Sequence, residues 1–205
     1  MEMDLAFKIL QSISVITASI VTICGITSWR REAKWKRKYE LAEEVLSLFY
    51  ECKEKIAIIR SPHSYSKEGK TRKRGENESQ EETERLDNAY VFIERYDKEK
   101  EPFIKLWTLK FRFMALFGKE ANKPFDEISQ ILNSIFLAAH HLGQRYWKEQ
   151  GQKTFTDAQF EKHLQVMNKY EKIIWADYDE SDEITSQVNS CISKIEKYCV
   201  TIMKK

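Results

Sequence analysis

The sequence predicts an all-α protein in which an N-terminal transmembrane helix continues into a cytoplasmic helical bundle of about five to six helices. Residues Ile9 to Trp29 form an apolar stretch without a charged side chain. After it, apolar residues recur at steps of three or four, the period of an α-helix. Only three Pro and six Gly occur in 205 residues, which favours long helices over a turn-rich β fold.

Residues 1–29 are expected to be an N-terminal tail and a membrane anchor. As a helix, Ile9 to Trp29 would measure about 31 Å, close to the thickness of a bilayer core. A cleaved signal peptide would carry its basic residues before the apolar run. Here only Lys8 precedes the run, whereas six Lys or Arg follow it by position 38. We therefore expect a single-pass protein of the inner (cytoplasmic) membrane, N-terminus outside and C-terminus inside. A helix buried in a soluble assembly is the alternative.

One face of this segment carries small or hydroxylated residues, which let transmembrane helices approach closely. These are Ser14, Ala18, Thr22, Gly25 and Ser28. They predict self-association, and in the extreme a polar-lined pore, so that a homo-oligomer or a protein partner is expected. In the alternative interpretation, the hydroxyl groups bond to their own helix.

Residues 30–60 are expected to form a long juxtamembrane helix, because apolar side chains keep helical spacing and no Gly or Pro interrupts them. At its start, aromatic and basic residues alternate in a pattern typical of lipid headgroup contact. They are Trp29, Arg30, Arg31, Lys34, Trp35, Lys36, Arg37 and Lys38. Each cation near an anionic leaflet contributes about 1 kcal/mol. The net charge of only +2 argues against nucleic acid as a partner.

Residues 61–82 are predicted to be a polar loop, basic and then acidic, which is mobile or serves a function. Ser61-Pro62 ends the preceding helix, since the residue before proline avoids the α region. A partner-binding surface is one interpretation, with anionic lipid, nucleic acid or an acidic protein as the ligand. Its residues would be His63, Lys67, Lys70, Arg72, Lys73 and Arg74. A solvated loop without a partner is the other interpretation.

Residues 83–205 are expected to form the helical bundle. Helix boundaries are marked by Pro102, Gly118, Pro124, Gly151, Thr154 or Thr156, and Ser181. The segment from Phe103 to Phe117 is apolar on nearly every side and is predicted to be the core helix. Interfacial membrane contact is the alternative for that segment.

No residue pattern predicts catalysis, a metal site or a cofactor. His140 and His141 are adjacent and would point about 100° apart on a helix, and His140 is interpreted as a core or boundary residue. Two residues separate Arg60 from His63, fewer than in the Arg–His motif of the HEPN ribonucleases.

Two other residue sets are also interpreted without a metal. The acidic cluster lacks the Gly and the closing Glu of an EF-hand loop, which favours a solvated turn. Its members are Asp177, Asp179, Glu180, Asp182 and Glu183. The four cysteines contain no C-x-x-C pair and are expected to be reduced and buried.

Two stretches resemble small uncharacterised bacterial proteins with one N-terminal transmembrane helix. They are Ile59-Arg60-Ser61-Pro62, and the segment from Phe113-Met114-Ala115-Leu116-Phe117-Gly118 through Pro124-Phe125-Asp126-Glu127-Ile128. The resemblance covers about half of the chain and implies no activity.

The sequence therefore favours a non-enzymatic, membrane-anchored cytoplasmic helical module that binds a partner or scaffolds an assembly. The first alternative is an oligomerising, membrane-perturbing effector of a bacterial defence or toxin system. The second is an enzyme that uses His63 or His140.

Overall fold

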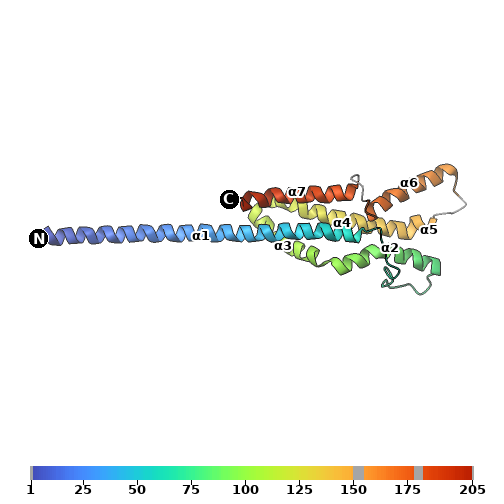
Figure 1. Cartoon of the computed structure of the whole chain (residues 1–205), viewed down its shortest axis with the longest axis horizontal. Helices are drawn as coiled ribbons and strands as arrows, with labels where there is room; N and C mark the ends of the chain where they lie inside the picture. The colour runs from blue at the N-terminus through green and yellow to red at the C-terminus, as the bar shows by residue number, and fades with distance from the viewer. Residues whose placement is uncertain (1, 150–154, 178–181, 205) are drawn as a thin grey trace.

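The chain forms one long helix and a bundle of shorter helices packed around its C-terminal half (Figure 1). The structure, a computed structural model, describes residues 2–149, 155–177 and 182–204, and the side chains from residue 10 onward except that of residue 12. These residues form helices and contain no strand, which confirms the all-α prediction. The predicted helix end at Gly151, the possible cap Thr154, the predicted start at Ser181, and Asp179 and Glu180 of the acidic cluster lie outside the described residues.

The long helix α1 (Glu2–Ile59) is unbroken from the apolar stretch into the bundle. Its N-terminal half projects away from the other helices, and the C-terminus of the chain lies near the point where α1 joins the bundle (Figure 1). From Leu41 onward, one face of α1 is buried against α7 and α3. The helix ends just before Ser61-Pro62, as the restricted backbone before proline predicts.

Local signals set the ends of α2 (Gln80–Glu99) and α3 (Glu101–Phe117). The Ser79 side chain accepts a hydrogen bond from the Glu82 amide and caps α2, which begins three residues before the predicted bundle boundary at 83. Pro102 lies in the first turn of α3, where its missing N–H costs no hydrogen bond. Gly118 ends α3 with a φ of 94°, a value that glycine adopts without strain.

The chain then turns through η1 (Lys119–Asn122) into α4 (Lys123–His141), which continues through the π-helical segment η2 (Leu142–Tyr146) into α5 (Trp147–Glu149). Gly143 in η2 allows α2 to approach closely, because a Cβ there would lie 2.4 Å from the Cβ of Ala89. The sequence does not predict this π-helical segment. Its consequence is a tight contact between α2 and the end of α4.

The last two helices begin with capping residues. Thr156 and Gln159 form a reciprocal capping box at α6 (Asp157–Ile174), in agreement with one of the two predicted caps. The Asp182 side chain caps α7 (Glu183–Met203) by accepting a hydrogen bond from the Thr185 amide. Helix α7 runs back along α1 (Figure 1).

Aromatic side chains dominate the core at the end of the bundle from which α1 projects. The Phe125 ring packs edge-on against Phe49 of α1, with centroids 5.1 Å apart. It also contacts Phe113 of α3, which stacks on Phe117 at 4.1 Å. Phe49, Phe113 and Phe125 are fully buried. These contacts fix α1, α3 and α4 relative to one another.

Candidate functional site

The N-terminal half of α1 exposes an apolar surface that no described part of the chain covers. Its large apolar side chains are between 47% and 69% exposed: Leu10, Ile13, Val15, Ile16, Ile20, Val21, Ile23, Ile26 and Trp29. Among the described residues, α1 alone is long and apolar enough to cross a membrane by length and composition. Its most apolar window of 18 residues has a mean hydropathy of 1.4, and none of that window is buried. A surface of this size is a candidate interface with lipid or with another protein.

The predicted association face lies on this uncovered half. Ser14, Ala18, Thr22, Gly25 and Ser28 are all exposed, and a Cβ at Gly25 would meet no atom within 4 Å. The Thr22 hydroxyl donates to the Ala18 carbonyl at 2.8 Å. Similar bonds within the helix come from Thr17, Ser19 and Thr27. These four hydroxyl groups already donate within their own helix, so they are not free donors for a pore lining.

The predicted headgroup residues form a basic band between the uncovered half of α1 and its packed half. Arg30, Arg31, Lys34, Trp35, Lys36 and Arg37 are exposed, and Lys38 is half-buried. The Trp35 and Tyr39 rings contact each other, with centroids 5.3 Å apart. Lys36 lies 3.9 Å from Glu40, its nearest acidic partner. Most of this charge therefore faces outward and is free for an anionic surface.

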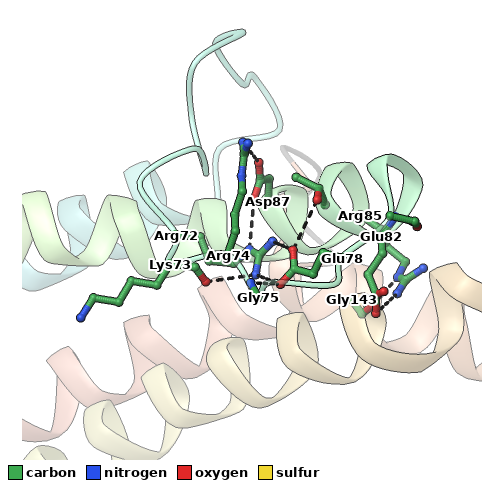
Figure 2. Close-up of polar contacts among 11 residues, drawn as sticks. Arg72, Lys73, Arg74, Gly75, Glu78, Glu82, Arg85, Asp87 and Gly143 are labelled. Atoms are coloured by element: carbon green, nitrogen blue, oxygen red, sulfur yellow. Dashed lines mark hydrogen bonds and ion pairs between the residues drawn. The ribbon is translucent and has the colours of Figure 1, made fainter.

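In contrast, the two arginines of the 61–79 loop, Arg72 and Arg74, are paired with carboxylates of this chain (Figure 2). Arg72 donates to Glu78 at 2.8 Å and to Asp87 of α2 at 3.0 Å. Arg74 donates to the other oxygen of Asp87 at 2.9 Å. Hydrogen bonds from Arg72 and from the Gly75 amide lower the pKa of Glu78 to about 2. The loop is thereby attached to α2 by charge pairs rather than by an apolar contact.

The beginning of the same loop is attached to the C-terminal part of α2. Arg95 is buried and donates to the carbonyls of Ile59, Ser61 and His63 as well as to Glu68. The neighbouring Glu94 accepts from the Gly69 amide at 2.8 Å and from the Thr71 hydroxyl. Gly69 is required at this turn, because its φ is 80° and a Cβ would lie 2.0 Å from the Asp87 carbonyl oxygen.

The predicted loop residues therefore divide into two groups. Arg72 and Arg74 are bound to carboxylates of this chain. The side chains of His63, Lys67, Lys70 and Lys73 are exposed and form no ion pair within the described part of the chain. These four side chains do not line a common pocket with Arg72 and Arg74. Because the two arginines are paired, the loop presents less free positive charge than its sequence suggests.

Lowering the pH from 5 to 2 is expected to loosen this loop. The pKa of Glu78 is lowered from 4.5 to about 2, so its contribution is complete above about pH 4.5 and is lost as the pH falls toward 2. Hydrogen bonds from Arg95 lower the pKa of Glu68, and a hydrogen bond from Lys98 lowers the pKa of Glu94. Protonation of these two carboxylates at low pH should therefore also loosen the loop. Hydrogen exchange of the Gly69 and Gly75 amides, corrected for intrinsic rate, should accelerate relative to amides of α4. In Glu78→Ala, which removes the acceptor of the Gly75 amide, Gly75 should exchange fast at both pH values. Equal behaviour of Gly75 and α4 would contradict this prediction.

A second buried charge network joins the end of α1 to α6 and α7. Arg60, only 1% exposed, donates to the carbonyls of Lys172, Ile173 and Trp175 at the end of α6, at 2.8 to 2.9 Å. It also donates to Asp182 at 2.9 Å. Burial raises the pKa of Asp182, but hydrogen bonds from Arg60 and from the Thr185 and Asp177 amides outweigh it, so the net pKa is lowered. Asp182 is thus a buried structural partner, which corrects its interpretation as part of a solvated turn.

The histidines are not arranged as a catalytic or metal site within the described residues. His140 is exposed, whereas His163, which has no sequence motif, is buried. The Nδ1 atom of His163 lies 3.7 Å from Glu149, and its ring lies against Tyr146 and Phe155. Nε2 has no hydrogen-bond partner among the described residues. In that part of the chain, no three His, Cys, Asp or Glu side chains are grouped to hold a metal ion.

The four cysteines differ in exposure. Cys24 is exposed on the uncovered half of α1, and Cys52, Cys191 and Cys199 are buried. Burial raises the pKa of each buried thiol to about 12. The three thiols of the bundle are therefore inert at neutral pH.

A groove of about 680 Å³ opens between α6 and α7, with Ser134 of α4 in its lining. Amides and charges of both signs line it, including Gln165, Asn168, Lys169, Glu183 and Gln187. Arg60 and Asp182 hold together the two helices that form its walls. The mixed lining provides hydrogen-bond donors and acceptors for a ligand.

No family model, curated protein or solved structure matches this chain. The resemblance to small bacterial membrane proteins therefore stays a prediction. The functional interpretation below comes from the geometry and chemistry of the chain itself.

The sequence locates the exposed residues of the site better than the buried ones. The face from Ser14 to Ser28 and the basic band both lie on the exposed part of α1, on one continuous helix. The buried polar residues Arg60, Arg95 and Asp182 do not follow from periodicity, because a charged residue in a pattern of apolar spacing is read as solvent-facing. The sequence signal for Arg60 is its position two residues before Pro62, at the end of α1.

Proposed function

We propose that this protein is anchored in the inner membrane by the N-terminal half of α1, with its helical bundle in the cytoplasm as a module that binds a protein or scaffolds an assembly. The observation that carries the proposal is the uncovered apolar surface of residues 10–29, followed directly by the exposed basic band. Water is an unfavourable solvent for such a surface, whereas a bilayer core matches it in both polarity and length.

The orientation follows from the position of the charges. Among the side chains that the structure describes, the exposed Arg and Lys lie on the bundle side of the apolar segment, and Lys8 alone precedes that segment in the sequence. Positive residues flanking a span are retained in the cytoplasm. Trp29 and Trp35 lie among them, and indole rings favour the headgroup level. The bundle should therefore face the cell interior.

The buried and half-buried arginines of the bundle support a binding or scaffolding role, because they bind groups of this chain and hold its helices in place. Arg60, Arg72 and Arg95 each bind two or more groups of this chain and join helices or hold the loop. Such networks maintain a rigid shape, which is what a docking module requires.

Membrane fractionation tests the anchor. We expect the full-length protein to remain in the membrane pellet after alkaline and high-salt washes and to be released by detergent. In the variant Ile16→Asp/Ile20→Asp, each substitution should make insertion about 3 kcal/mol less favourable, and the protein should move to the supernatant. Ile58→Asp is the matched control, because Ile58 is an exposed isoleucine on the packed half of the same helix. Recovery of the wild-type protein as a soluble monomer without detergent would overturn the proposal.

A further inference from the structure

The outward face of α3 carries an apolar stripe that no described residue covers. Phe111 is 71% exposed and Ile104 is 53% exposed, and their spacing of seven residues places them on the same face. Thr108 and Ala115, both exposed, continue this face. The opposite face of α3 is buried, so the helix is already packed on its core side. Exposed apolar stripes of this kind mark interaction surfaces.

Lipid does not reach this stripe if the proposed anchor is correct, and the inference rests on that proposal. Phe113, two residues from Phe111, contacts Phe125, which packs against Phe49 of α1. Phe49 lies 20 residues beyond Trp29, or about 30 Å along the helix. The headgroup layer extends only about 5 to 8 Å beyond the hydrocarbon core. A protein surface, rather than lipid, is therefore the candidate to cover the stripe.

The outward face of α1 at the same height is acidic, opposite in charge to Arg112 beside the stripe. It exposes five glutamates, Glu40, Glu43, Glu44, Glu51 and Glu54, around Ser47 and Tyr50. Beside the apolar stripe, α3 exposes Arg112 and Lys105, of which Lys105 is paired with Glu101 of its own helix. Opposite charges flanking an apolar contact favour association and fix its register.

We propose that the α3 stripe of one molecule docks on the outward face of α1 of a second copy held in the same membrane. The common anchor places both surfaces at the same distance from the bilayer. The contact joins the α3 stripe of one copy to the α1 face of the next copy. In a pair, one α3 stripe and one α1 face therefore remain free. Further copies can add at these free surfaces and form a ring or a row. A scaffold assembled in this way needs no other protein.

This arrangement keeps neighbouring anchors apart. The α3 helix lies between the two α1 helices, and packed helices are about 8 to 10 Å apart. Neighbouring α1 helices would then lie up to about 20 Å apart, too far for a disulfide between Cys24 residues. Association through the face from Ser14 to Ser28 would instead bring together thiols placed on that face, as in Ala18→Cys. The native Cys24 lies about 100° around the helix from the centre of the face. The three buried cysteines do not interfere with this comparison.

Cross-linking of the full-length protein in native membranes tests the proposal. A carbodiimide, which joins carboxylates to amines at zero length, should yield a ladder of dimers and larger species. Phe111→Asp should reduce the ladder at least tenfold. Leu137→Asp should not, although Leu137 is 56% exposed on α4. Arg112→Glu should also reduce the ladder, and adding Glu43→Arg/Glu44→Arg should restore it. Near-UV circular dichroism would confirm that each variant is folded.

The outcomes distinguish a failure of the proposed docking surface from a failure of the proposed membrane anchor. An unchanged ladder in Phe111→Asp and Arg112→Glu would overturn the docking surface, as would a wild-type protein that forms no ladder. Disulfide cross-linking of Ala18→Cys by copper-catalysed oxidation would show that association runs through the face from Ser14 to Ser28 instead. Fractionation of the same samples reports on the anchor independently, so that loss from the membrane would refute the proposed function rather than this surface alone.

Discussion

Replacing Arg60 by methionine is expected to lower the free energy of unfolding of the bundle by about 3 to 5 kcal/mol. The substitution keeps an apolar stem but leaves Asp182 buried without its cation. The carbonyls of Lys172, Ile173 and Trp175 also lose their donor. Denaturant unfolding in a mild detergent, followed by tryptophan fluorescence, measures the effect. Trp175 is a suitable reporter because its ring packs on Phe92 at 4.7 Å.

Two comparisons make this result specific to the buried pair. Arg74→Met removes an ion pair whose arginine side chain is 52% exposed, and it should cost less than about 1 kcal/mol. Asp182→Asn added to Arg60→Met removes the unpaired charge while keeping an N-cap residue for α7, and it should recover part of the lost stability. Equal losses in Arg60→Met and Arg74→Met would show that the network does not hold the helices together.

Replacing Phe125 by alanine is expected to lower the free energy of unfolding by about 3 to 5 kcal/mol. The ring is fully buried and contacts Phe49 of α1 and Phe113 of α3, so its removal leaves a cavity where three helices meet. Leu137→Ala on the same helix is the control, because an exposed side chain makes few contacts and should cost under about 1 kcal/mol. The same unfolding measurement applies. A loss below about 1 kcal/mol in Phe125→Ala would show that this aromatic cluster is not a rigid core.

The sequence predicts the helices well because their limits depend on neighbouring residues. Pro102 and Pro124 open α3 and α4, and Gly118 ends α3, each through a backbone property that is independent of the rest of the chain. The apolar period of α1 likewise identifies the face that the bundle buries. These features require no knowledge of tertiary contacts.

The buried charges could not be predicted, because their partners are distant in the sequence. Arg60 and Asp182 are 122 residues apart. Arg95 reaches back more than thirty residues to the carbonyls that follow α1. For the same reason the 61–79 loop looks unstructured in the sequence. It contains almost no large apolar side chain, and the groups that bind it lie on α2.

The exposed features carry less information about their partners. Ser14, Ala18 and Gly25 share a face in sequence and in structure, but their spacing is compatible with several kinds of contact. Phe111 was assigned to a core helix because its segment is apolar on nearly every side. The structure shows that α3 buries one face and leaves Phe111 on the other.

If the proposed anchor is correct, the unbroken course of α1 sets the angle of the bundle as well as its distance from the membrane. Between Trp29 and Leu41 there is no glycine or proline at which the chain could swivel. Each residue in that shaft contributes about 100° of rotation but only about 1.5 Å of length. Deleting a single residue would therefore turn the bundle by more than a quarter of a circle while barely lowering it. The number of residues between Trp29 and Leu41 therefore determines the rotation of the bundle about the axis of α1. Inserting or deleting seven residues, about two full turns, would preserve that rotation far better than inserting or deleting one.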